Sequence, residues 1–331
     1  MSNNAILVTG GAGYIGSHVA LMLSEAGEQV VVLDNLSTGF REAVLQSEFI
    51  EGNTGDSELV DRVLRDYHID TVMHFAAHTI VPESVTDPLG YYQNNTCATR
   101  NLLESCQRAG VKHFVFSSTA AVYGMPDNGL ARETSPTTPI NPYGTSKLVS
   151  EWMLRDLSAA SDLRYVALRY FNVAGSDPRG RIGQCTRKAT LLIKVACEVA
   201  LGKRPELTIY GTDYPTPDGT GVRDYIHVTD LAAAHVRALE YLRRGGTSQT
   251  LNVGYGQGFS VREVIAAIER ASGKPLPVRE APRRSGDPAQ LVAISDAIRE
   301  VLDWQPTLND LDTIVSTSLE WERALLAGKV G

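Results

Sequence analysis

Short apolar runs alternate with amphipathic segments along the first half of the chain. Their spacing predicts strands at 5–8, 30–33, 49–56, 71–77, 112–119 and 164–172. Between these runs it predicts helices at 17–26, 59–67 and 88–110, and a further helix that Pro142 caps or starts. Regular alternation of strand and helix with short connections indicates an α/β fold with a doubly wound parallel sheet.

The second half has a different character. Apolar runs predict strands at 207–210, 250–254 and 291–294, and helices at 230–243 and 260–273. The second of these helices begins with Ser260 and Glu263, the pattern of a capping box. We expect the later elements to form a smaller, discontinuous α/β lobe that covers the carboxyl edge of the sheet.

Three glycines follow the first predicted strand in the pattern Gly10-x-x-Gly13-x-x-Gly16. Such glycines allow a tight turn and bring the backbone close to a pyrophosphate at a helix N-terminus. The second strand ends in Asp34, 18 residues after Gly16, where a carboxylate accepts both hydroxyls of an adenosine ribose and repels a 2′-phosphate. The sequence therefore predicts a Rossmann nucleotide-binding unit that prefers NAD over NADP.

A tyrosine and a lysine lie four residues apart at the start of the helix after Pro142, so Tyr143 and Lys147 share one helical face. A free tyrosine has a pKa of about 10 and is a poor base at neutral pH. A held ammonium and a nicotinamide cation can lower that pKa by roughly three units, or about 4 kcal/mol. The spacing is common by chance, and it gains meaning from the nucleotide-binding unit upstream. We interpret Tyr143 as a phenolate base.

Composition excludes several classes. The chain has 331 residues, 43% of them hydrophobic, and a net charge of −7, which argues against nucleic acid or an anionic membrane as the main partner. No apolar run approaches the roughly 20 residues of a membrane span, and residues 1–4 lack signal-peptide character. The cysteines are scattered and the histidines lack ligand spacing, so we expect reduced, buried cysteines in a cytoplasmic protein and no structural metal.

The glycine turn and the tyrosine–lysine pair resemble the extended short-chain dehydrogenase/reductase family. Within it, several stretches resemble the bacterial UDP-glucose 4-epimerases, and the match covers nearly the whole chain. The most specific of these stretches is 213–227. Others are at 13–18, 34–36, 74–77, 116–119 and 169–172.

The resemblance implies a mechanism of 4-epimerisation between UDP-galactose and UDP-glucose, in galactose metabolism. Tyr143 would take the proton of the sugar 4-hydroxyl while a hydride passes to NAD. Thr119 would hydrogen-bond the same oxygen, and Lys147 would bind the nicotinamide ribose and keep Tyr143 ionised. The 4-keto sugar would turn and take the hydride back on its other face. The resemblance also implies a homodimer that pairs the helices after Pro88 and Tyr143.

Site residues follow from the resemblance position by position. The catalytic set is Tyr143, Lys147 and Thr119. The residues expected at NAD are Gly10, Gly13, Tyr14, Ile15, Gly16, Asp34, Asn35, Asp56, Ser57, Phe75, Ala76, Ala77, Asn94, Ser117, Tyr143, Lys147 and Tyr170. Those expected at the UDP-sugar are Thr119, Tyr143, Asn172, Arg223, Arg284 and Asp287. The implied division is a Rossmann domain at 1–176, with 224–258 returning to it, and a nucleotide-sugar lobe at 177–223 and 259–331.

The chain departs from the family's pattern in three places. His78 and Thr79 stand where a lysine is often found near the pyrophosphate, so neutralisation would depend more on Arg223, Arg284 and backbone amides. The segment 187–191 lacks the usual asparagine or histidine, and no substrate contact is expected from it. Leu291 lies where side-chain size decides whether an N-acetyl group fits. Its intermediate size leaves that choice open, and it could equally be only lobe core.

Other activities on this fold stay open. The same groups could epimerise UDP-GlcNAc and UDP-GalNAc, or UDP-xylose and UDP-arabinose. Dehydratases and decarboxylases need an additional acid after the strand-five threonine, where this chain has Ala120 and Ala121. A dehydrogenase that releases NADH, and a nucleotide-sensing protein without catalysis, are the remaining alternatives.

Overall fold

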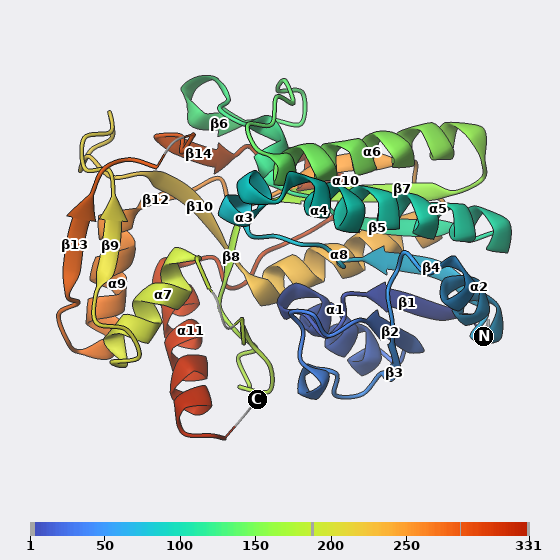
Figure 1. Cartoon of the computed structure of the whole chain (residues 1–331), viewed down its shortest axis with the longest axis horizontal. Coiled ribbons are helices and arrows are strands. Elements are labelled where there is room, and N and C mark those ends of the chain that lie inside the picture. Colours follow the sequence, from blue (N-terminus) through green and yellow to red (C-terminus); the bar gives the residue numbers. More distant parts are fainter. Residues whose placement is uncertain (1–3, 187–188, 285, 330–331) are drawn as a thin grey trace.

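The computed structural model describes residues 4–186, 189–284 and 286–329. A seven-stranded sheet, all of whose strands pair in parallel, forms its larger part (Figure 1). The strands lie in the order β11-β7-β5-β4-β1-β2-β3. Their bounds are β1 (Ala5–Thr9), β2 (Val30–Asp34), β3 (Glu48–Glu51), β4 (Ile69–His74), β5 (His113–Ser117), β7 (Arg164–Tyr170) and β11 (Gln249–Val253). The chain runs outward from β1 to β3 and then returns to β4, so the strand order switches direction between β1 and β4, where ligands of such sheets bind.

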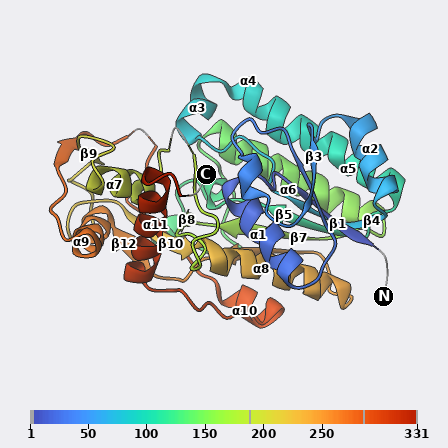
Figure 2. The ribbon, with the colours of Figure 1, turned by 90° about the horizontal axis from the view of Figure 1, so that it is seen from below.

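Helices cover both faces of this sheet, because successive side chains of each buried strand point to opposite faces. Ile6 and Val8 of β1 pack in one core with α1 (Tyr14–Glu25), α8 (Val228–Arg243) and α10 (Asp296–Leu302). Leu7 packs in a second core with α2 (Ser57–Asp66), α5 (Ala98–Ala109) and α6 (Pro142–Ala160). Figure 2 shows α1 and α8 on the side of the sheet away from α5 and α6. The predicted doubly wound parallel sheet is confirmed.

The predicted helix at 88–110 is continuous but irregular. It consists of α4 (Pro88–Tyr91), a π-helical stretch (Tyr92–Cys97) and α5, and it ends at Gly110, whose φ is 71°. A short helix before it, α3 (Val81–Thr86), was absent from the sequence prediction.

The smaller lobe is built around its own core. The strands are β6 (Leu130–Ala131), β8 (Asn172–Ala174), β9 (Leu207–Tyr210), β10 (Val222–His227), β12 (Gly258–Ser260), β13 (Val278–Ala281) and β14 (Gln290–Ala293). The helices are α7 (Leu192–Ala200), α9 (Val261–Ser272) and α11 (Leu311–Leu326), which pack on one another. The capping box at the start of α9 is confirmed, since Ser260 and Glu263 make both of its hydrogen bonds.

Two expectations about the later elements differ from the structure. The predicted strand at 164–172 is two strands: β7 ends at Tyr170 in the large sheet, and β8 begins at Asn172 and pairs with β10. The range 259–331 contains α10, which packs against α8 and β11 of the larger part.

The four cysteines are free, but only Cys106 and Cys197 are buried, whereas Cys97 is exposed and Cys185 is half-buried. The prediction that all four are buried is therefore wrong for Cys97 and Cys185. Among the described residues, no helix combines the length and the apolar character that crossing a membrane requires.

Candidate active site

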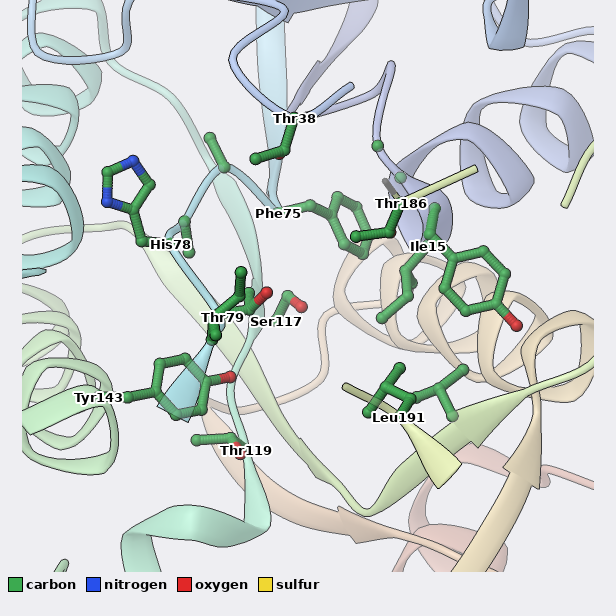
Figure 3. A pocket seen from close by; sticks show the side chains of 18 of the residues that line it. Ile15, Thr38, Phe75, His78, Thr79, Ser117, Thr119, Tyr143, Thr186 and Leu191 are labelled. Carbon is green, nitrogen blue, oxygen red and sulfur yellow. The ribbon is translucent and has the colours of Figure 1, made fainter. Parts of the chain in front are cut away.

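A cavity of about 420 Å³ lies at the carboxyl ends of the central strands and is walled by residues of both the large sheet and the lobe. Most of the predicted site residues line it. They are Gly10, Gly13, Tyr14, Ile15, Gly16, Asp34, Asn35, Phe75, Ala76, Ala77, Asn94, Ser117, Thr119, Tyr143, Tyr170, Asn172 and Arg223. The lining does not include Asp56, Ser57, Lys147, Arg284 or Asp287. Figure 3 shows part of this wall, with Tyr143, Thr119 and Ser117 grouped on one side.

The glycine turn between β1 and α1 leaves no room for side chains. Gly10 has a φ of +69°, and a Cβ there would collide with the backbone of Ala76. A Cβ on Gly16 would collide with the carbonyl oxygen of Gly10. The first turn of α1 contains no acidic residue, so its free N–H groups suit a phosphate. This cradle fits the pyrophosphate of a dinucleotide.

Asp34 at the end of β2 has the position that the ribose role requires. Its carboxylate accepts hydrogen bonds from the backbone N–H groups of Ala12 (3.0 Å) and Leu36 (2.8 Å). Burial raises the pKa of Asp34, and these backbone hydrogen bonds oppose that rise. With the glycine turn, this acid makes the residues present fit NAD.

Tyr143 and Thr119 form the polar pair of the site. Asn141 caps α6 by accepting from the N–H of Gly144 at 2.8 Å, which fixes the first turn that carries Tyr143. Thr119 Oγ1 accepts from the N–H of Ala121 at 3.1 Å, so its own proton is free to be donated to the tyrosine oxygen. Burial raises the pKa of Tyr143, and the hydrogen bond with Thr119 lowers it.

Lys147 lies one turn further along α6, buried behind the cavity wall. Its Nζ is 4.6 Å from the centroid of the Phe116 ring. Burial lowers the pKa of Lys147 to about 7, and Glu151 opposes that shift. The role of Lys147 in holding Tyr143 ionised stays a prediction, and burial disfavours the charged form of both groups.

Two cavity residues from different strands are coupled beside this pair. The hydroxyl groups of Ser117 and Tyr170 are 2.7 Å apart. On the opposite side of the glycine turn, the Tyr14 hydroxyl donates to the carbonyl of Gly175 at 2.6 Å and ties α1 to the start of the lobe.

The UDP-side residues separate into two groups. Arg223 lines the cavity, and its guanidinium pairs with the carboxylate of Asp287 and donates to the carbonyl of Pro288 at 2.8 Å. Arg284 is exposed and lies over the ring of Tyr210, with its Cζ 3.9 Å from the ring centroid. The structure thus brings Arg223 and Asp287 together and leaves Arg284 outside the lining.

Asp56 also has a structural use. Its side chain caps α2 by accepting from the N–H of Leu59 at 3.1 Å. Asn53 and Thr54, just before it, line the cavity instead.

Residues of loops and of α3 that the sequence analysis missed supply much of the remaining wall. Beyond His78 and Thr79 these include Ile80, Val81, Glu83, Gln184, Thr186, Ala189, Thr190 and Leu191. Arg187 and Lys188 lie outside the described residues, but 189–191 line the cavity although no substrate contact was expected from that segment. Leu291 also lines it while packing against the core around Tyr123. No periodic pattern marks these loop positions, so only the fold reveals them.

The fold and the cavity define a class of enzymes that hold a nicotinamide dinucleotide at the carboxyl ends of a parallel sheet. The chain belongs to the NAD dependent epimerase/dehydratase family, whose model matches residues 6–254. This family membership confirms NAD as the cofactor and agrees with the resemblance inferred from the sequence. The roles of individual site residues stay predictions.

Similar proteins indicate a narrower group within this family. The chain is 59% identical to a UDP-glucose 4-epimerase of Azospirillum brasilense, over 97% of this chain and 92% of the relative. It is similar to the structure of UDP-glucose 4-epimerase from Brucella ovis in complex with NAD, with 45% identity, a TM-score of 0.93, and 96% and 98% of the two chains covered. The UDP-Glc/GlcNAc 4-epimerase of Campylobacter jejuni matches at 47% identity and a TM-score of 0.85, over 97% and 99% of the chains.

Proposed function

We propose that this chain interconverts UDP-galactose and UDP-glucose by epimerisation at C4, with NAD kept in the site. The observation that carries the proposal is that Tyr143 and Thr119 both line the cavity of a chain 59% identical to a UDP-glucose 4-epimerase. The hydroxyl pair supplies the acid–base chemistry, and the relative's name supplies the sugar.

Each residue has a defined task. Bound NAD would supply the acceptor and the donor for the hydride at C4. Tyr143 removes the proton of the 4-hydroxyl and later gives it back, while Thr119 hydrogen-bonds the same oxygen and keeps the proton path short. Lys147, buried on the same helical face, contributes positive charge that favours the phenolate.

The UDP part must stay bound while the hexose turns. Arg223 and Asn172 line the lobe side of the cavity and are suited to hold the diphosphate and the nucleotide. A guanidinium binds a phosphate with two parallel, charge-assisted hydrogen bonds. Because Arg223 is paired with Asp287, we infer that phosphate binding shares or replaces this pair, and that Asp287 contacts the ribose next to it.

The test uses the purified protein with UDP-galactose and no added NAD, followed by proton NMR of the sugar. Conversion to UDP-glucose is expected, because the cofactor is regenerated in every cycle and need not leave. Absence of conversion, also after NAD is added, would contradict the proposal. Stoichiometric NADH in solution would instead indicate a dehydrogenase.

A second candidate is 4-epimerisation of UDP-GlcNAc. The Campylobacter jejuni relative is named for both UDP-Glc and UDP-GlcNAc, and Leu291, of intermediate size, lines the cavity here. The same NMR assay with UDP-GlcNAc decides it, and UDP-xylose serves as the pentose comparison. Dehydration is disfavoured, since Ala120 and Ala121 line the cavity where that reaction needs an acid.

We also propose a cytoplasmic homodimer that acts in galactose metabolism. Large apolar side chains are exposed on the helices expected to pair and on the neighbouring α3: Leu89 is 78% exposed, Val85 of α3 62% and Trp152 46%. They lie on α4, α3 and α6, which contact one another. Light scattering at micromolar concentration is expected to give twice the chain mass of 35.9 kDa, and a mass near that of one chain would contradict the dimer.

A further inference from the structure

A buried carboxylate lies directly behind the catalytic wall and has no place in the mechanism above. Glu151 follows Lys147 by one helical turn on α6 and is only 5% exposed. It accepts a hydrogen bond from Ser118 Oγ at 2.5 Å. It also accepts from Nε of Arg169 at 3.0 Å and from Nη2 of Arg169 at 2.6 Å.

The alternation of side chains at the end of β5 explains why this contact matters. Ser117 and Thr119 line the cavity, whereas Ser118 between them is fully buried on the other side and outside the lining. Its hydroxyl is held by Glu151, and its backbone N–H donates to the carbonyl of Leu168 at 2.9 Å. The residue next to catalytic Thr119 is therefore fixed from two elements.

Arg169 connects Glu151 to further hydrogen-bond partners in other elements. Its Nη1 donates to the Tyr123 hydroxyl at 3.0 Å, and that hydroxyl donates to Asn252 Oδ1 at 2.6 Å. Asn252 in turn donates to the carbonyls of Ala131 (2.9 Å) and Ile294 (3.2 Å). Every side chain in this network is held by at least one partner, as a rigid buried polar network requires.

We propose that Glu151 is a positioning residue for the reaction proposed above, on which this inference rests. One carboxylate joins α6, which carries Tyr143 and Lys147, to Ser118, which lies between the end of β5 and Thr119, and to Arg169 of β7. It thereby fixes the spacing of the three catalytic side chains. Its charge also stabilises the ammonium of Lys147.

The effect of Glu151 on the ammonium of Lys147 depends on which other charged groups face this lysine. Glu151 raises the pKa of Lys147 against the lowering caused by burial. His74 of β4 is close enough to feel the lysine charge, but burial lowers its pKa to about 3, so it is neutral. Tyr143 lies on the same face of α6, and Arg169 is paired with Glu151. Removing the carboxylate would leave two buried cations without their anion.

The decisive variant is Glu151→Gln in the NAD-loaded protein, because glutamine keeps the shape and loses the charge. We expect kcat for UDP-galactose to fall by about 10- to 100-fold with KM changed by less than about threefold, since small displacements of catalytic groups cost rates of this order. The alkaline limb of the kcat profile is expected to move to lower pH by about one unit or more, because Lys147 loses its proton more easily.

Three companion variants separate the two effects. Ser118→Ala keeps the charge and breaks the tie to β5, so we expect a loss of several-fold in kcat without a shift of the alkaline limb. Glu151→Asp restores the charge on a shorter side chain. The alkaline limb of the kcat profile is therefore expected to return to its wild-type position while kcat stays low. Glu322→Gln is the matched control: this buried carboxylate on α11 pairs with Lys194 and Lys203, away from the cavity, and its loss is expected to leave the limb in place.

A titration makes the inference independent of turnover. The tyrosinate absorbance of each protein is measured against the same protein carrying Tyr143→Phe, which isolates Tyr143. We expect a higher pKa of Tyr143 in Glu151→Gln than in the wild type, because a neutral Lys147 no longer favours the phenolate. If the wild type converts no UDP-sugar, the proposed function fails while this titration still decides the role of Glu151.

The inference would be overturned if Glu151→Gln had the kcat, the pH profile and the Tyr143 titration of the wild type. It would also be overturned if Glu322→Gln shifted the alkaline limb as far as Glu151→Gln does. If Glu151→Gln does not fold, Ser118→Ala and Glu151→Asp decide, and wild-type kcat in both would overturn it.

Discussion

At the scale of single residues, the site depends on groups whose ionisation is set by burial. Tyr143 is buried and its pKa is raised, with only the hydrogen bond from Thr119 acting against that rise. Lys147 has a pKa lowered to about 7, so it carries only part of its charge at neutral pH. The sequence predicts an ammonium beside a tyrosinate. In the structure both groups are buried, and burial disfavours the charged form of each.

Removing the tyrosine oxygen tests its role directly. Tyr143→Phe keeps the ring in its buried place, so we expect the fold and the bound NAD to be retained. Turnover of UDP-galactose is expected to fall by about 10²- to 10⁴-fold, the usual contribution of a general base. The NMR assay gives the rate, and NAD released from the denatured protein gives the occupancy. Near-normal turnover with full NAD occupancy would mean that another group is the base.

The ionisation of Tyr143 is expected to depend on the cofactor. Because burial raises the pKa of Tyr143 above its ordinary value of 10.0, the positive charge of the oxidised nicotinamide ring is expected to act with Lys147 in favouring the phenolate. The absorbance titration of Tyr143 is therefore expected to show a lower pKa with NAD bound than after its removal. The same pKa in both states would assign the lowering to the protein alone.

At the scale of elements, the glycine turn that joins β1 to α1 is closely packed. We expect Gly16→Ala to lose NAD, since its Cβ would meet the carbonyl oxygen of Gly10 and displace the turn that holds the pyrophosphate. The molar ratio of NAD to protein after purification measures the loss. Gly110→Ala is the matched control: its φ is +71° but no atom lies within 4 Å of the new Cβ. It is expected to cost about 1–2 kcal/mol of stability and to keep NAD. Equal NAD content in the two variants would show that the turn tolerates a side chain.

Elements with strong local signals were predictable from the sequence, whereas those set by tertiary contacts were not. The capping box at Ser260 and the strands β1 and β2 are local features, and the structure has them. The π-helical stretch is different, because it directs Asn95 toward distant partners. Asn95 exchanges hydrogen bonds with the backbone of His78 (2.8 and 3.0 Å) and donates to Ser146 Oγ at 3.1 Å. No pattern within 92–97 announces contacts of that range, and such bulges are frequent at functional sites.

The residues of the site divide in the same way into those that local sequence signals predict and those that tertiary contacts place. Residues in the glycine turn and at strand ends were predicted, because parallel strands bring their carboxyl ends to one edge. Arg223 and Arg284 were both expected at the UDP-sugar, yet only Arg223, on β10, lines the cavity. Arg284 lies in a loop, where neither periodicity nor pairing fixes the direction of a side chain.

At the scale of the whole molecule, the buried histidines connect stability to pH. Burial lowers the pKa of His74 to about 3 and those of His18, His227 and His235 to about 4, from an ordinary value of 6.5. The folded protein therefore keeps them neutral in a range where the unfolded chain binds protons. Asp224 acts in the opposite direction, because burial raises its pKa from 3.8 to about 6, and burial also raises the pKa of Asp34. The four histidines outweigh these two carboxyl groups.

Stability is accordingly expected to fall as the pH drops from about 6.5 toward 4, since in that window the unfolded state binds more protons than the folded state. The urea midpoint of unfolding, measured at several pH values across the window, reports this slope. His235→Phe removes one of the buried titrating groups, whose Nε2 has no hydrogen-bond partner, so its slope is expected to be shallower. His68→Asn is the control: His68 is exposed with a φ of 51°, a conformation that asparagine tolerates, and the wild-type slope should persist. A slope unchanged by His235→Phe would place the acid sensitivity in other groups.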